Sequence, residues 1–104
     1  MKERDLVKKI RTHLETKYGA VVVKHWGGSF AQAGVADLLI CLSGGRYCAV
    51  EVKTKTGTTS ALQDDFLRRV RVAGGIAFVA RSIEDVDNLL GWLLLEKKEA
   101  VDKF

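Results

Sequence analysis

The chain has 104 residues, of which 47% are hydrophobic. It has 17 basic and 13 acidic side chains, which give a net charge of +4. This charge suits a polyanionic partner but does not identify one. This length fits one domain, 1–104, and the apolar content excludes a disordered chain. The first ten residues are charged and acidic residues interrupt the apolar C-terminal segment, so we expect neither a secretory signal nor a membrane span.

Apolar periodicity and turn residues divide the chain into seven elements. In chain order these are a helix over 3–18, a strand over 21–26, hairpin strands at about 36–42 and 47–53, a helix from the Ser60 cap to about 73, a strand over 76–80 and a helix from 83 to about 98. The stretch from Val50 to Val79 is a βαβ unit, whose strands are expected to be parallel. The order αβββαβα therefore predicts an α/β fold, a mixed four-stranded sheet flanked by helices.

The hydrophobic pattern indicates the register of the hairpin. A two- or four-residue loop would place Asp37 opposite Val52, pointing away from Glu51. A three-residue loop, with glycine in a left-handed conformation, places Asp37 opposite Glu51. It also gathers the apolar side chains on one face: Leu38, Ile40, Leu42, Cys48, Val50 and Val52. We favour the three-residue loop because register follows the buried face.

The other face of the hairpin then carries Asp37, Glu51 and Lys53 at one end. Paired carboxylates make the oxygen-lined site that Mg²⁺ or Mn²⁺ prefers. Lys53 lies on the same strand face, where an ammonium group can orient a water or neutralise charge on a phosphate. The alternative is a structural salt bridge at the end of the sheet. The two cysteines, Cys41 and Cys48, do not face each other in this register and are expected to be reduced core thiols of a cytoplasmic protein.

Four motifs together resemble a known family: Glu3, Gly34-Val35-Ala36-Asp37, Glu51-Val52-Lys53 and Gln63. This combination is similar to the virus-type replication-repair nuclease (VRR-NUC) domain of the PD-(D/E)XK nuclease superfamily. The resemblance runs from Glu3 to about Ser82 and is to a small, stand-alone, phage-type member, which would act in the host cytoplasm. Ala36 departs from the family pattern, which commonly has proline there, and alanine is expected to loosen the start of the strand.

The resemblance implies a restriction-endonuclease-like αβββαβ(α) core and a divalent-metal-dependent DNA endonuclease. It implies that Asp37, Glu51, Glu3 and the carbonyl of Val52 hold Mg²⁺ or Mn²⁺. Lys53 would position the attacking water or stabilise the transition state. Gln63 would orient Lys53 or the substrate phosphate. Stand-alone relatives resemble Holliday-junction resolvases, so branched DNA and a homodimer are the expected partners.

Each of these roles has a simpler structural alternative. Glu3 can be an acid that stabilises the start of its helix, and Gln63 can complete a capping box with Ser60. We do not expect one amide to serve both the cap and the site. Lys55 and His25 are candidate DNA contacts, although a solvated histidine beside a core Trp26 is the simpler interpretation of that segment.

The alternative function is a non-catalytic DNA-binding module with a nuclease-like fold, and a third possibility is a protein-interaction domain. The last helix supports a partner surface. Its apolar stripe is widened by Leu89, Trp92 and Leu95 beyond what one buried face needs. We interpret this stripe as a homodimer contact. The alternative is that all three helices pack deeply into the core.

Overall fold

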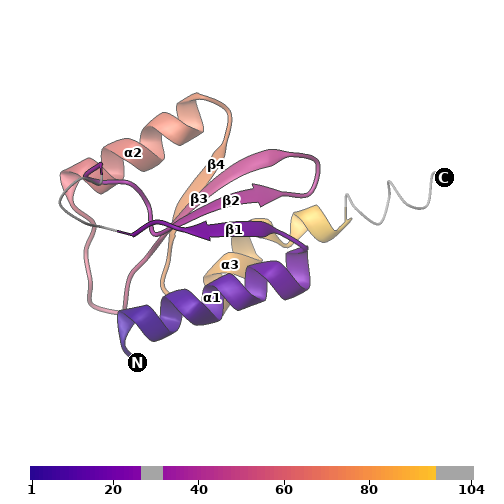
Figure 1. The fold of residues 1–104 in the computed structure, drawn as a ribbon, viewed down its shortest axis with the longest axis horizontal. Coiled ribbons are helices and arrows are strands. Elements are labelled where there is room, and N and C mark those ends of the chain that lie inside the picture. Colours follow the sequence, from indigo (N-terminus) through magenta and orange to yellow (C-terminus); the bar gives the residue numbers. More distant parts are fainter. Residues whose placement is uncertain (27–31, 96–104) are drawn as a thin grey trace.

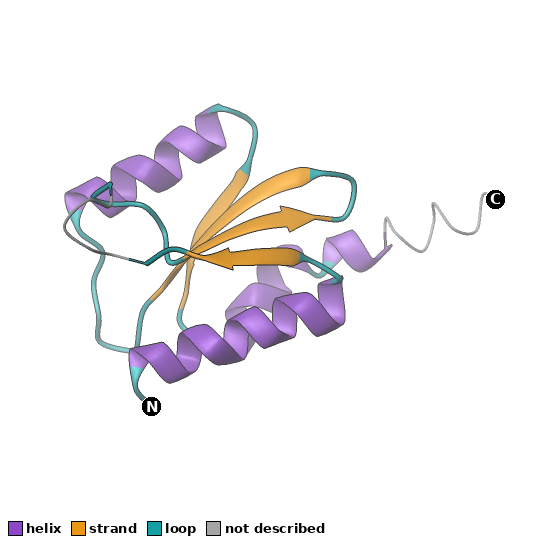
Figure 2. Cartoon of the chain, in the orientation of Figure 1, coloured by secondary structure: helices purple, strands orange, loops and turns teal. Residues whose placement is uncertain are grey.

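The computed structural model describes residues 1–26 and 32–95. A four-stranded sheet lies between α2 on one face and α1 and α3 on the other (Figure 1). The elements are α1 (Glu3–Tyr18), β1 (Val21–Lys24), β2 (Leu38–Leu42), β3 (Arg46–Val52), α2 (Ala61–Val72), β4 (Ile76–Ala80) and α3 (Ile83–Leu90). Figure 2 shows these helices and strands with the loops that join them.

The sheet has the predicted mixed topology, so the α/β fold with helices on both faces of the sheet is confirmed. Its strands follow the order β1-β2-β3-β4. β1 and β2 are antiparallel, as are β2 and β3, whereas β3 and β4 are parallel and connected through α2. No helix within residues 1–26 and 32–95 is long and apolar enough to cross a membrane.

The hairpin of β2 and β3 has the register that patterning favoured. Leu42 pairs with Arg46 and Leu38 with Val50, and three residues form the loop. Gly44 and Gly45 have φ values of 84° and 76°, the left-handed conformation that glycine adopts without strain. The predicted apolar side chains all lie in the main core: Leu38, Ile40, Leu42, Cys48, Val50 and Val52.

Two hydrophobic clusters hold the layers together. The larger one packs α1 and α3 against the sheet, with Ile10, Leu14 and Leu90 fully buried. The smaller one packs α2 against the opposite face, through Leu67 and Val70 of the helix. Each fully buried aliphatic side chain contributes on the order of 1.5–3 kcal/mol, so these clusters fix the ends of the strands where the polar site lies.

Three expectations are wrong in detail. Trp26 is 75% exposed rather than a core residue, since β1 already ends at Lys24. Cys41 is exposed, whereas Cys48 is buried as predicted. The last helix is interrupted at Gly91, where a flexible residue lowers helix propensity, and helical backbone resumes over 92–95.

The apolar stripe of the last helix is exposed, as a partner surface requires, and the homodimer itself stays a prediction. Leu89, Trp92 and Leu95 are 46%, 40% and 66% exposed, so deep packing of these side chains is excluded. Two expectations lie outside the described residues: part of the small-residue connector, at 27–31, and the helix end at 96–98.

Candidate metal centre

Three carboxylates converge where the N-terminus of α1 meets the ends of two strands. Glu3, Asp37 and Glu51 each offer one oxygen atom, and these atoms lie within 4.8 Å of one another. Glu3 opens α1, Asp37 directly precedes β2, and Glu51 is the penultimate residue of β3. The sequence therefore predicted the three acidic members of this cluster, and the fold brings them together.

Asp37 and Glu51 are held together by reciprocal bonds to the backbone. The Asp37 N–H donates to Glu51 Oε1 at 3.1 Å, and the Val52 N–H donates to Asp37 Oδ2 at 2.9 Å. Each carboxylate is thus fixed by the strand that carries the other, which follows from the hairpin register. The role of the Val52 carbonyl as a ligand stays a prediction.

Glu51 is a charged side chain in the core, with an exposed fraction of 1%. Burial and then repulsion from Asp37 raise the pKa of Glu51 to about 7, against the opposing effect of Lys53. Negative charge is therefore incompletely compensated at this point. A bound cation would relieve both causes of the shift, and the all-oxygen donor set suits Mg²⁺ or Mn²⁺. The residues present fit the metal that the sequence predicted.

Lys53 lies beside the buried carboxylate, as the strand alternation predicted. Its Nζ is 3.4 Å from Glu51 Oε2, and its side chain is 16% exposed. The Lys53 backbone N–H donates to the Ala80 carbonyl at 3.1 Å, which continues the pairing of β3 with β4. The ammonium group is thus positioned from a fixed backbone and remains partly accessible.

Gln63 reaches the site from the first turn of α2. Its Nε2 donates to Glu51 Oε2 at 2.8 Å, while its Oε1 accepts from the Ser60 N–H at 2.9 Å. The Gln63 N–H also donates to Ser60 Oγ at 3.2 Å, which completes the capping box. The expectation that one amide would not serve both cap and site is wrong, because an amide has a donor end and an acceptor end.

His25 and Lys55 have different relations to the cluster. The His25 backbone N–H donates to the Asp37 carbonyl at 2.8 Å, so this residue supports the chain at Asp37 through its backbone. Lys55 is exposed in the loop that follows Lys53. Their contact with DNA stays a prediction.

The supporting roles of two residues, Arg81 and Gly34, were missed by sequence reasoning. Arg81 Nη1 donates to the carbonyls of Thr54 and Gly57, at 2.7 and 2.6 Å, and so fixes the loop that carries Lys55. Gly34 has a φ of 83°, and a Cβ atom there would lie 2.7 Å from the Leu62 carbonyl oxygen. The glycine of the Gly34–Asp37 motif was a visible signal for a close backbone approach, but nothing local to Arg81 revealed its partners.

The substitution of alanine for proline at position 36 has a structural compensation. Ala36 is fully buried in the smaller cluster, between the sheet and α2. Packing therefore restrains the start of the strand where the family commonly has a rigid proline ring.

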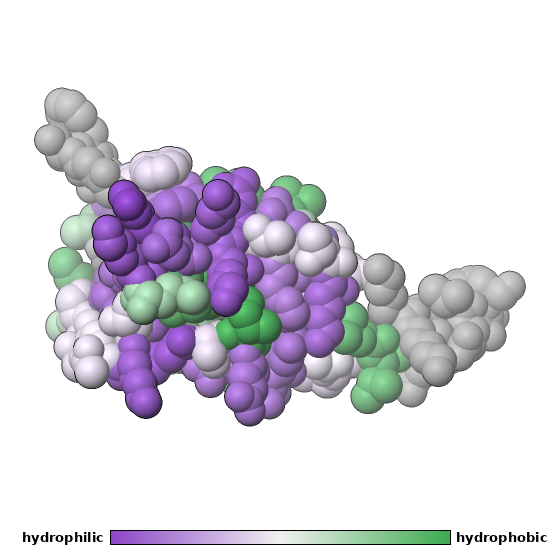
Figure 3. Space-filling view, turned by 90° about the horizontal axis from the view of Figure 1, so that it is seen from below, coloured by the Kyte–Doolittle hydropathy of each residue, from purple (hydrophilic) through white to green (hydrophobic). Residues whose placement is uncertain are grey.

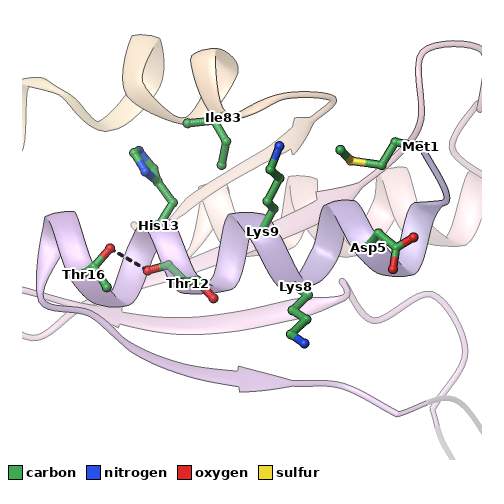
Figure 4. Close-up of a pocket in the computed structure, with 8 residues that line it drawn as sticks. All are labelled: Met1, Asp5, Lys8, Lys9, Thr12, His13, Thr16 and Ile83. Carbon is green, nitrogen blue, oxygen red and sulfur yellow. Dashed lines mark hydrogen bonds between the residues drawn. The ribbon is translucent and has the colours of Figure 1, made fainter.

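A separate hollow of about 580 Å³ lies along α1, next to the start of α3 (Figure 4). Lys9, His13 and Ile83 line it together with other side chains of the N-terminal region. None of the residues of the carboxylate cluster lines this hollow, nor do Lys53 and Gln63, so it is distinct from the candidate metal centre.

Solved structures with the same fold were found by comparison. One, described as "VRR_NUC domain", is 27% identical, with a TM-score of 0.69, and the match covers 88% of this chain and 97% of that chain. Another, described as "VRR_NUC domain protein", has the same TM-score at 15% identity and covers 88% of this chain and 87% of its own; at that identity it shows the fold alone. No family model and no curated protein matched the sequence. The resemblance predicted from the motifs is confirmed by these structures.

Proposed function

We propose that residues 1–104, whose fold matches that of VRR-NUC domain structures, form a single divalent-metal-dependent endonuclease domain that hydrolyses phosphodiester bonds in DNA. The observation that carries this proposal is the convergence of Glu3, Asp37 and Glu51 oxygens within 4.8 Å of one another. A structural salt bridge needs one carboxylate and one cation, so it gives no reason for three acids at one point.

The chemistry of the donor set supports a hard cation. Glu51 is buried with a raised pKa of about 7, and Asp37 contributes to that shift, so the site has affinity for added positive charge. A divalent cation bound there would act as a Lewis acid on the scissile phosphate and lower the pKa of a water molecule.

The other side chains have separate tasks in the proposed reaction. Lys53, with its Nζ 3.4 Å from Glu51 Oε2, orients the attacking water or neutralises charge that develops on the phosphate. Gln63 holds the Glu51 carboxylate in position through its 2.8 Å bond and acts as a positioning residue. In-line attack breaks the bond from phosphorus to the 3′ oxygen, and the products carry 5′-phosphate ends.

The finer substrate assignment rests on the family resemblance. We propose branched DNA, of the Holliday-junction type, and a homodimer that places two centres against two strands. The exposed Leu89, Trp92 and Leu95 support a partner surface on the C-terminal side of the molecule. A cytoplasmic location and a phage-type origin remain predictions from the sequence.

Cleavage of labelled four-way junction, flap and plain duplex DNA with Mg²⁺ or Mn²⁺ tests this proposal. Paired symmetric cuts in the junction are expected, and EDTA or Glu51→Ala should abolish them. Glu3→Gln should lower the rate, while Glu15→Gln serves as its matched control, since Glu15 lies on the same helix but pairs with Arg11.

The alternative is a DNA-binding module without catalysis. A folded protein that binds Mn²⁺ and DNA but cuts none of these substrates would support this alternative and overturn the nuclease assignment. Binding that does not weaken with salt would contradict both, because phosphate contacts release counterions.

A further inference from the structure

A second groove lies between α1 and the end of β1. It has a volume of about 700 Å³. Its lining includes four cationic side chains, one carboxylate and one large aromatic ring: Arg4, Lys8, Arg11, Lys24, Asp5 and Trp26. None of these residues belongs to the carboxylate cluster.

Trp26 gives the groove an aromatic surface. It is 75% exposed, and Lys24 Nζ lies 4.5 Å from the centre of its ring. This cation–π contact orients the indole at the end of β1. An exposed, oriented aromatic ring next to cations is the combination with which proteins hold unpaired nucleotides, since the base stacks on the ring and cations contact the backbone.

The cations of α1 form a row along the groove. Arg4, Lys8 and Arg11 follow the spacing i, i+4 and i+7, which places them on one side of the helix over about 10 Å. Figure 4 shows Lys8 pointing away from Lys9 and His13, towards β1. Arg11 is anchored to the Val22 carbonyl at 3.3 Å. The side of the molecule on which α1 lies is mainly hydrophilic (Figure 3).

The groove and the metal centre share their supporting elements. Arg4 directly follows Glu3 in α1, and Trp26 directly follows His25, whose N–H donates to the Asp37 carbonyl at 2.8 Å. A strand that lies in the groove would therefore reach the carboxylate cluster without leaving the protein surface.

We propose that this groove binds a stretch of the DNA substrate that is unpaired at the branch point, with a base stacked on Trp26 and phosphates on Arg4, Lys8 and Lys24. A base within a duplex is already stacked on both faces, so the aromatic surface favours a base that has left the stack next to the cleaved bond. This inference rests on the proposed nuclease function and assigns a feature of its substrate.

Intrinsic fluorescence provides a direct readout, because the chain has only two tryptophans. The Trp92→Phe protein, which keeps Trp26 as its single tryptophan, is titrated in EDTA with oligo(dT) and with duplex DNA of equal length. The single strand should quench Trp26 fluorescence at lower concentration than the duplex does. The affinity for labelled oligo(dT) is then measured in variants that keep Trp92. Trp26→Ala should weaken binding about 5- to 100-fold, whereas Trp26→Phe should retain most of the affinity.

Lys8→Ala should weaken the binding as well, whereas Arg68→Ala, the matched control for the loss of charge, should not, since Arg68 lies on α2 and pairs with Asp65. Equal binding of single strand and duplex, an unchanged affinity of Trp26→Ala, or a clear preference for oligo(U) over oligo(dT) would overturn the inference. Cleavage of DNA without oligo(dT) binding would reject the groove and keep the nuclease. Trp26-dependent binding of oligo(dT) without cleavage of any substrate would reject the nuclease and keep the groove.

Discussion

The amide of Gln63 connects the cap of α2 to the buried carboxylate of Glu51. Its Nε2 donates to Glu51 Oε2 at 2.8 Å, and its Oε1 accepts from the Ser60 N–H at 2.9 Å. The two bonds fix the orientation of the amide, since turning it over would place a donor against a donor at Ser60. The start of α2 therefore determines how the Glu51 carboxylate is presented.

The role of Gln63 in the helix cap can therefore be separated by mutation from its role at the candidate metal centre. Gln63→Ala removes both bonds, whereas Ser60→Ala removes the hydroxyl that accepts from the Gln63 N–H and leaves the amide in place. Both variants should lose about 0.5–2 kcal/mol of stability in urea denaturation. Only Gln63→Ala should also lower Mn²⁺ affinity, by about 10- to 100-fold in titration calorimetry. Equal metal affinity in both variants would show that Gln63 serves the helix alone.

The raised pKa of Glu51 makes metal binding depend on pH. Burial and Asp37 raise this pKa from 4.5 to about 7, so between these values the folded protein holds a proton that the unfolded chain releases. The stability contributed by this group is thus present below pH 4.5 and is lost as the pH rises to about 7. A cation needs the ionised carboxylate, so it compensates for this loss only at the higher pH.

Mn²⁺ should therefore raise the melting temperature little at about pH 5.5 and clearly at about pH 8. Differential scanning fluorimetry at both pH values measures the difference. Glu51→Ala is the control and should show only a small shift at either pH. A shift of equal size at both pH values would mean that Glu51 is already ionised in the metal-free protein at the lower pH.

The register of the hairpin was predictable because one rule determined it. Side chains alternate along a strand, so burying Leu38 and Val50 on one face obliges Asp37 and Glu51 to share the other. The motif residues then had to meet at one end of the sheet. The same logic predicted the βαβ unit, since parallel neighbours need a crossover element between them.

Other features depend on how the layers cover the sheet, which local patterns do not specify. α2 packs on β3 and β4, so Val21 and Val23 of β1 stay exposed on that side and Trp26 lies beyond the core. The bonds from Arg81 to Thr54 and Gly57 join segments more than twenty residues apart. Their formation follows from the pairing of β3 with β4 and has no local signature.

The close approach of Gly34 to α2 should make this position intolerant of any side chain. Gly34 and Gly44 have nearly equal φ values of 83° and 84°, but a Cβ would meet Leu62 at 2.7 Å in the first case and no atom within 4 Å in the second. Gly44→Ala should thus lower the free energy of unfolding by about 1–2 kcal/mol, because alanine is strained in the left-handed conformation. Gly34→Ala should lower the free energy of unfolding by about 1–3 kcal/mol more, because its Cβ would clash with Leu62. Urea denaturation of both variants provides the comparison, and equal losses would contradict the packing argument.

The loop after β3 should depend on Arg81. Arg81→Ala removes the bonds to Thr54 and Gly57 and frees the segment that carries Lys55 next to Lys53. We expect kcat/KM for DNA cleavage to fall on the order of tenfold or more, because small displacements of catalytic groups are costly. Arg71→Ala is the matched control, since Arg71 donates to the Ala77 carbonyl at 2.9 Å, away from the cluster. An equal fall in both variants would indicate a general loss of stability.

The exposed apolar side chains of the C-terminal region test the proposed homodimer. Leu89 and Leu95 are 46% and 66% exposed, and Trp92 stacks with Arg46 at 5.0 Å, so this surface joins α3 to the hairpin. If a second copy covers it, Leu89→Glu should give a monomer in light scattering, since burying an unpaired charge at the contact is unfavourable. The monomer should then nick four-way junctions without pairing its cuts. Val72→Glu is the control, because Val72 is 76% exposed on α2, on the opposite face of the sheet. A dimer that persists in Leu89→Glu would place the interface elsewhere, and a monomeric wild type would contradict the homodimer.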